Sequence, residues 1–362
     1  MSSSAKSLTE GPLAKQILLV SLPLVLSNLL QVLFNMSDVA VVGRFAGSTA
    51  LGSVGSTSIF VTLFTGFLIG LSNGVNVLVA RFYGARHADD VEKTVHSALL
   101  VSIAAGVLLL LIGLLGSPAL LHLLNTKEDL YPGAVLYLRV YFLGMPALAL
   151  YNYGNAIFSA IGETKKPLYY LCIAGALNIL LNYMFIFGKW GAPAMGCAGA
   201  AVATLLSRVL EVLVVTGCFF RSKRLPVKPG LMLRPGRIIA GDFIKYSLPV
   251  VLNEGMWSLA MSLFSIIMGH MPNSTPILAA YTIAGNIDRM AAVALFAAGN
   301  AAAVIIGRDI GCGDTKEIYG KGVALNFVCF VTGIISMGIL LTIRATLLDG
   351  FIFPLMDISA EA

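Results

Sequence analysis

Charged residues are scarce in this chain, since Asp, Glu, Lys and Arg make up only 12% of its 362 residues. An ordinary soluble domain carries about a quarter. So few charges cannot cover the surface of a water-soluble fold. Hydrophobic residues contribute 57%, and the mean hydropathy is +0.87 over the whole length. We therefore expect lipid to surround most of the fold and no sizeable soluble domain to be present.

The sequence also lacks the patterns of metal, redox and nucleotide enzymes. Its five cysteines are scattered through apolar segments, with neither CxxC spacing nor a Cys/His cluster. We interpret them as small buried side chains. The net charge of +6 is distributed over alternating loops, which is typical of membrane topology rather than of nucleic-acid binding. The sequence thus predicts no enzyme, no cofactor and no nucleic-acid partner.

What is present is a series of nine apolar runs. Each approaches or exceeds the roughly 20 residues that an α-helix needs to cross a bilayer core. They cover 17–42, 53–80, 95–116, 131–161, 168–187, 196–220, 243–269, 277–306 and 322–343. We predict an all-α membrane protein, a polytopic helical bundle that crosses the membrane nine times.

Lys and Arg are distributed unequally between the two sets of loops. The segments on the side of the N-terminus hold 17 of them, and the opposite loops hold five. Positively charged loops favour the cytoplasmic side. We therefore expect a multi-pass protein of the cell membrane with its N-terminus in the cytoplasm and, after nine spans, its C-terminus outside.

Two segments of the sequence recur at nearly one offset. SLPLVLSN, from Ser21, returns as SLPVVLNE from Ser247, and ARFYG, from Ala80, aligns with GRDIG from Gly307, at shifts of 226 and 227. A polar, basic connection separates the halves. We predict a six-helix N-terminal lobe over 1–220, a cytoplasmic linker over 221–242 and a partial C-terminal lobe of three helices over 243–362, with the substrate between lobes. This pattern predicts that the chain stops before a tenth span.

Asp38 lies deep in the first apolar run. An ionised carboxylate at bilayer depth costs about 2.5 to 3.5 kcal/mol even on a lenient insertion scale, so it is retained mainly where it faces a cavity or a partner. Burial disfavours its charge and a bound cation favours it, so protons and cations compete for one group. The alternative is that Asp38 lies near the outer end of the helix and only caps it.

Asn178 and Asn182 lie one helical turn apart on the run 168–187 and share a face. Their amide oxygens can complete an oxygen shell around Na⁺ or accept a hydrogen bond from a protonated Asp38. We predict a Na⁺ or H⁺ site at these three residues. The alternative is that the two amides form hydrogen bonds between packed helices.

Other polar or small residues inside the runs predict contacts between helices. Arg208 and Glu211 are three apart and share a face, which indicates an internal ion pair. Glycines recur every four residues at 66, 70 and 74 and predict close helix packing. Asp288, beside Arg289, is a candidate for contact with substrate, and the alternative is a pair that neutralises itself against other helices.

Several stretches resemble the prokaryotic branch of the multidrug and toxic compound extrusion (MATE) family: GPLAKQILLVSLPLVLSNLLQVLFNMSDVAVVGR, NGVNVLVARFYGAR, YLRVYFLGMPALALYN, AIGETKKP and LNILLNYMFIFG. The resemblance covers about residues 10 to 350. It implies twelve helices in two six-helix lobes around a central cavity, and antiport of organic cations against Na⁺ or H⁺. The chain departs from the family by lacking helices ten to twelve.

The resemblance also implies roles for individual residues. Asp38 matches the coupling aspartate of the first helix, with Asn178 and Asn182 at polar positions of the cation site. Tyr137 and Asn152 match the polar network around that aspartate.

In the second half, the resemblance makes Glu254 the acidic residue of the C-terminal lobe, with a role in coupling or substrate binding. Pro23 and Pro249 occupy matching places in the two lobes, where proline permits a helix to bend. They are candidate hinges, and the alternative is a kink without function.

These observations together predict a monomeric, cation-coupled antiporter that exports amphipathic, cationic organic compounds such as drugs. Two alternatives stay open. One is a flippase of related fold for lipids or lipid-linked precursors, and the other is a non-transporting fragment.

Overall fold

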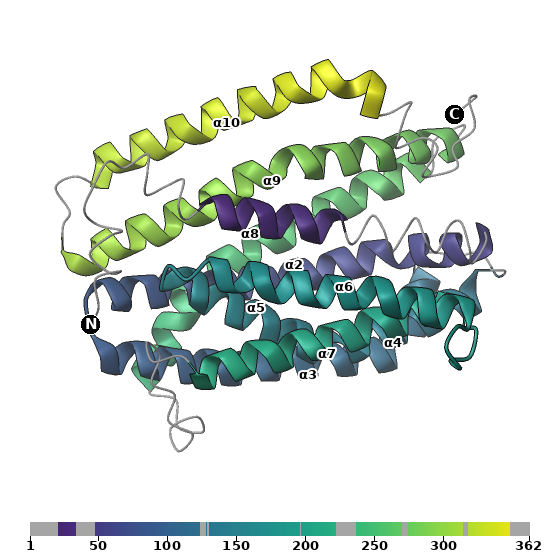
Figure 1. Cartoon of the computed structure of the whole chain (residues 1–362), viewed down its shortest axis with the longest axis horizontal. Helices are drawn as coiled ribbons and strands as arrows, with labels where there is room; N and C mark the ends of the chain where they lie inside the picture. The colour runs from purple at the N-terminus through teal and green to yellow at the C-terminus, as the bar shows by residue number, and fades with distance from the viewer. Residues whose placement is uncertain are drawn as a thin grey trace.

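The computed structural model describes residues 21–33, 48–123, 128, 130–195, 197–221, 237–269, 274–313 and 318–347. Helices running roughly along the long axis of the molecule dominate these ranges, and no strand occurs in them (Figure 1). A first helix is described over Ser21–Leu33. The others are α2 (Ser48–Gly84), α3 (Ala88–Leu123), α4 (Tyr131–Leu143), α5 (Met145–Ala160), α6 (Lys165–Phe187), α7 (Cys197–Arg221), α8 (Arg237–Gly269), α9 (Ser274–Cys312) and α10 (Ile318–Leu347).

The predicted fold class, an all-α membrane protein, is confirmed. Among the described residues, six helices are long and apolar enough to cross a membrane, or seven if α4 and α5 form one bent span. A described helix also coincides with each of the nine predicted runs.

Most helices are longer than the apolar runs that predicted them. Helix α3, for example, has 36 residues and begins with Ala88, Asp89 and Asp90, before the run predicted from residue 95. At about 1.5 Å per residue it exceeds the roughly 30 Å of a bilayer core. Helix α8 likewise begins at Arg237, inside the predicted linker, rather than at residue 243. Apolarity marks only the part of a helix that lipid surrounds, because helical hydrogen bonding continues into water.

The run predicted as one helix over 131–161 is instead two helices, α4 and α5, bent by 44°. Pro146 stands at the start of α5 and has no N–H to donate to a carbonyl in the preceding turn. At the break, the Gly144 N–H donates to the Tyr141 carbonyl at 3.0 Å. The missing donor and the proline ring explain the bend.

The apolar core lies in the first half of the chain, where α2, α3, α4 and α5 pack together. Phe142 of α4 and Phe158 of α5 are fully buried in it. Phe142 meets the ring of Phe64 from α2 edge to face at 5.2 Å. The Tyr153 hydroxyl of α5 donates to the Val95 carbonyl of α3 at 2.8 Å, so its polar end is satisfied inside the core.

Helix α2 also packs against α8 from the second half of the chain, through the predicted glycine stripe. A Cβ at Gly66 would lie 2.6 Å from the Ser258 hydroxyl, and one at Gly70 would lie 2.9 Å from the Val251 Cα. A Cβ at Gly74 would overlap Ser247. Only glycine permits the two backbones to approach this closely, so the predicted packing role of the stripe is confirmed.

Gly217 of α7 differs from these glycines, because nothing lies within 4 Å of the place where its Cβ would be. We expect Gly217→Ala to stabilise the protein by about 0.5 to 1 kcal/mol, since alanine loses less backbone entropy in a helix and meets no neighbour here. The midpoint of thermal unfolding in detergent micelles measures the effect. A lower midpoint would show that Gly217 has a contact of its own.

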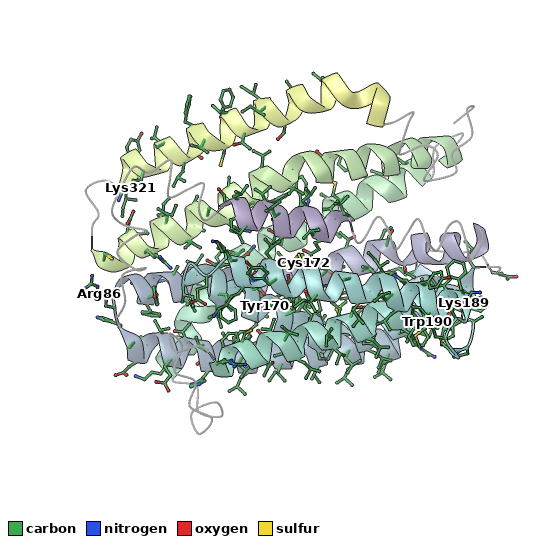
Figure 2. All side chains as sticks on the ribbon, in the orientation of Figure 1. Arg86, Tyr170, Cys172, Lys189, Trp190 and Lys321 are labelled. Atoms are coloured by element: carbon green, nitrogen blue, oxygen red, sulfur yellow. The ribbon has the colours of Figure 1, made fainter. Side chains whose placement is uncertain are left out.

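The two ends of the bundle carry different groups. Arg86, after α2, and Lys321, in α10, lie at one end, whereas Lys189 and Trp190, after α6, lie at the other (Figure 2). The sequence assigned the segments of Arg86 and Lys321 to the same side of the membrane, and the two residues lie at the same end of the molecule.

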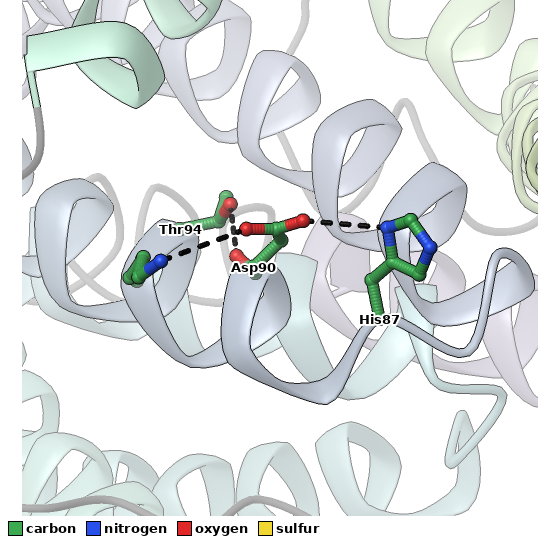
Figure 3. A network of polar contacts seen from close by, with 4 residues as sticks. His87, Asp90 and Thr94 are labelled. Atoms are coloured by element: carbon green, nitrogen blue, oxygen red, sulfur yellow. Dashed lines mark hydrogen bonds and ion pairs between the residues drawn. The ribbon is translucent and has the colours of Figure 1, made fainter.

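Polar contacts surround the start of α3 at the first of these ends (Figure 3). Asp90 lies 3.3 Å from His87 Nδ1 and 3.9 Å from Lys93 Nζ, and its backbone carbonyl accepts the Thr94 hydroxyl at 2.6 Å. Acidic residues are favourable in the first turn of a helix. Because the side chains are largely exposed, the ion pairs add little stability. We interpret the group as the solvated end of a membrane helix.

Candidate functional site

A pair of buried amides on α6 forms the centre of the candidate site. Asn178 and Asn182 are 7% and 3% exposed, and the Asn182 Nδ2 donates to the Asn178 Oδ1 at 3.0 Å. Their neighbours Ile179 and Leu180 are about half exposed, as expected for side chains that face lipid. The prediction that the two amides share one face is confirmed, and that face is the inner one.

The amides of this pair can serve a cation or a proton. The Asn178 Oδ1 accepts one hydrogen bond and has a second lone pair. An amide oxygen is a suitable ligand for Na⁺ and an acceptor for a protonated carboxyl group. Asp38, the carboxylate predicted to join the pair, lies outside the described residues, so the complete site stays a prediction.

The two other residues of the predicted network lie on either side of the bend between α4 and α5. Tyr137 of α4 is half-buried, and its ring stacks on that of Tyr141 at 6.3 Å. The Tyr141 hydroxyl in turn lies 3.3 Å from the Thr65 hydroxyl of α2. Asn152 of α5 is half-buried, and its Nδ2 is enclosed without a hydrogen-bond partner among the described residues. Sequence reasoning did not identify Tyr141 and Thr65 as members of this group.

Helix α7 contributes a buried ion pair, as predicted. The Arg208 Nη1 donates to the Glu211 Oε2 at 2.8 Å, and the Glu211 side chain is fully buried. Arg208 also lies over the ring of Tyr151 from α5, with its Cζ 5.7 Å from the ring centre. Two opposite charges in contact let α7 stay in lipid, because the pair as a whole is neutral.

The acidic candidates of the second half occupy different surroundings. Glu254 of α8 is half-buried and faces α2, where its Cβ lies 3.4 Å from the place of a Cβ at Gly70. It therefore lies at the contact between the two halves of the chain. Asp288 of α9 is exposed. Their roles in coupling or substrate binding stay predictions.

The candidate hinges also differ from each other. Pro23 is buried in the first helix, and its carbonyl accepts the Ser27 hydroxyl at 2.9 Å. Pro249 lies inside α8 and is exposed. This is a bond from a serine hydroxyl to the carbonyl four residues earlier, a contact that often accompanies a bend in a helix. Bending at either residue is a prediction.

The sequence of this chain matches the profile of the MatE family over residues 23–184. It is 27% identical over 316 residues to the probable multidrug resistance protein YoeA of Bacillus subtilis, covering 84% of this chain and 67% of YoeA. It is also 27% identical to the probable multidrug resistance protein NorM of Thermotoga maritima, covering 84% of this chain and 65% of NorM. The chain spans about two thirds of the length of these relatives.

Solved structures share the fold. One is an outward-facing multidrug resistance MATE family transporter of the MOP superfamily, with a TM-score of 0.85 and 23% identity over 94% of this chain and 74% of the other. Another is a MOP superfamily transporter from Pyrococcus furiosus, with a TM-score of 0.86 and 22% identity over 99% of this chain and 77% of the other.

The matched profile includes α2, α3, α4, α5 and most of α6, and so the hydrogen-bonded amides of the candidate site. The relatives similar over most of this chain are named as multidrug resistance proteins, and the fold is that of solved MATE transporters. This chain is thus similar to the multidrug and toxic compound extrusion (MATE) family, over residues 23–184 by the family profile and over 84% of its length by its relatives, and that family consists of membrane transporters and not of enzymes.

Proposed function

We propose that this protein is a cation-coupled antiporter that exports amphipathic organic cations, such as drugs, across the cell membrane. The observation that carries the proposal is the hydrogen-bonded pair Asn178 and Asn182, buried on the inner face of a helix that crosses the membrane. Polar groups at this depth are costly and are retained mainly for ions, protons or substrates. The names of the relatives support drugs as the cargo.

In this proposal Asp38 and the two amides bind H⁺ or Na⁺ from outside, with Tyr137 and Asn152 in the surrounding network. Cargo enters from the cytoplasm between the lobes 1–220 and 243–362, and Glu254 and Asp288 contribute negative charge in the second lobe. Binding of the cation and of the cargo exclude each other, so a cation gradient drives export. The N-terminus lies in the cytoplasm, and one chain suffices.

Efflux from vesicles under an imposed gradient tests this proposal. We expect the parent protein to expel a fluorescent organic cation when Na⁺ or H⁺ is supplied from outside, and Asp38→Asn to reduce efflux to the level of protein-free vesicles. An asparagine cannot carry the charge for which the cation competes. Separate Na⁺ and pH gradients identify the coupling ion.

Asp89→Asn is the matched control, because it makes the same chemical change at an exposed position in the first turn of α3. It should leave efflux unchanged. Asn182→Leu should weaken cation-driven efflux, because it removes one amide of the pair. Undiminished efflux in Asp38→Asn would exclude Asp38 as the coupling residue.

A further inference from the structure

Arg308, near the end of α9, joins the two halves of the chain. Its side chain is nearly buried, with the residue 4% exposed. Its Nε and Nη2 both donate to the Ala160 carbonyl, at 3.2 and 2.9 Å. Its Cζ lies 5.1 Å from the centre of the Tyr83 ring, at the end of α2. One guanidinium of the second half thus binds the ends of two helices of the first half.

The Ala160 carbonyl is available because of the way in which α5 ends. Gly162 adopts a positive φ of 79°, which turns the chain out of the helix. In this turn the carbonyls of Phe158 and Ser159 accept backbone N–H groups at 2.8 and 2.9 Å. The Ala160 carbonyl is the last of the helix and points along its axis, where the dipole is negative. Arg308 supplies the positive donor that this end requires.

The helices that carry these groups cross without space for side chains. A Cβ at Gly84 of α2 would overlap the backbone of Arg308, and a Cβ at Gly311 of α9 would overlap the backbone of Arg81. The Cys312 thiol adds a contact by donating to the Gly84 carbonyl at 3.0 Å. The crossing thus places α2 and α9 in direct backbone contact.

The chemistry of the contact makes it reversible. Across the junction between the two halves, Arg308 binds a neutral carbonyl and an aromatic face. The carboxylate next to it, of Asp309, accepts from Lys321 of α10 at 3.0 Å, within the second half. A hydrogen bond between a charged and a neutral group contributes modestly to stability. Separation lets water hydrate the guanidinium, so the contact can hold the halves together without making opening prohibitive.

We propose that Arg308 locks the two halves together at the end of the bundle that carries Arg86 and Lys321 (Figure 2), and that this lock opens in each transport cycle. This inference rests on the proposed function, and the proposed orientation makes the locked end the cytoplasmic one. Cargo then enters only while the Arg308–Ala160 contact is broken. Arg308 is a positioning residue, since it acts by holding α5, α2 and α9 in place.

Distances between spin labels test the lock directly. Labels are attached to cysteines at Asp89 and Tyr319, two exposed positions near this end, after the native cysteines have been replaced by serine. We expect short distances in the parent protein. In Arg308→Gln the population with longer distances should rise about tenfold or more, because the hydrogen bonds of a charged donor are lost.

Arg86→Gln is the matched control, since it removes an exposed arginine at the same end, and it should leave the distances unchanged. Arg308→Lys keeps the charge but cannot donate from two nitrogens to the Ala160 carbonyl, so we expect a smaller rise of the long-distance population than in Arg308→Gln. It also replaces Arg308→Gln as the test variant if the latter does not fold. Distances equal to those of the parent in the folded variants would overturn the proposal. Failure of the proposed function would instead appear as a lack of cation-driven efflux in the parent, with the distance change still present.

Discussion

Replacement of Glu211 by leucine is expected to lower the free energy of unfolding by about 3 to 5 kcal/mol. Glu211 is the only described carboxylate in contact with Arg208, and it is fully buried. Without the Glu211 carboxylate, the positive charge of Arg208 stays in a membrane-spanning helix. The ring of Tyr151 is then the group that still stabilises this charge. A cation–π contact contributes about 0.5 to 2 kcal/mol, which is too little to replace the lost charge. The midpoint of thermal unfolding in detergent measures the loss.

The double variant Arg208→Met, Glu211→Leu provides the control. It removes both charges and fills similar volumes with apolar groups, so we expect a stability close to that of the parent. The two single variants and the double variant form a cycle that gives the coupling energy. If Glu211→Leu were as stable as the parent, Arg208 would have to reach water or another anion. Near-parental efflux in the double variant would limit the pair to a structural role.

Gly74→Val is the second substitution with a large expected effect, about 3 kcal/mol of lost stability. A Cβ at Gly74 would lie 2.6 Å from the Cα of Ser247, so the clash involves backbone and not only a side chain that can rotate. Helices α2 and α8 would have to separate along the stripe to accept it. Thermal unfolding again provides the measurement, and the spin-label distances show whether the halves move apart.

Gly255→Val on α8 is the matched control, because nothing lies within 4 Å of the place of its Cβ. We expect its stability to stay within about 1 kcal/mol of the parent, because valine and glycine differ by less than this in helix propensity and the new side chain meets no neighbour. Adding Ser247→Gly to Gly74→Val should restore part of the loss, since it removes the Ser247 side chain but not the backbone contact. Equal effects of the two valine substitutions would contradict the close approach of α2 and α8.

The sequence predicts those features of the fold that depend on composition and on helical spacing. Apolar runs identify the helices because lipid selects apolar side chains along about 20 residues. The spacing of four at Gly66, Gly70 and Gly74 predicts a contact face, and the spacing of three between Arg208 and Glu211 predicts their ion pair. Each of these is a local pattern, in which position along one helix determines which side chains are neighbours.

Two features of the fold were not predicted. One is the bend at Gly144 and Pro146: both residues favour helix ends, but the apolar run continues through them and predicts one helix. The other depends on residues that are distant in the sequence. The Arg308 contact joins residues 148 positions apart, and nothing near Arg308 in the sequence points to the Ala160 carbonyl. The repeat match identified the right segment but not its partner.

The candidate site was predicted in part for the same reason. The hydrogen bond between Asn178 and Asn182 follows from helical spacing. The contact between Tyr141 and Thr65 joins different helices, and spacing cannot predict it. Asp38 lies outside the described residues, and its place relative to the amides stays a prediction, because no local pattern determines how two distant segments pack.

The crossing of α2 and α9 has the form of a symmetric dimer contact within one chain. Gly84 faces Arg308 as Gly311 faces Arg81, and the place of a Cβ at Gly307 lies 3.2 Å from the Cβ of its own counterpart, Ala80. In a two-fold interface each surface binds a copy of itself. If the two halves were identical separate chains that formed a dimer, both contacts would come from the same residues. A single substitution would then change both contacts at once. In a single chain the two halves can change independently. Arg308 can therefore have a role that its counterpart Arg81 does not share.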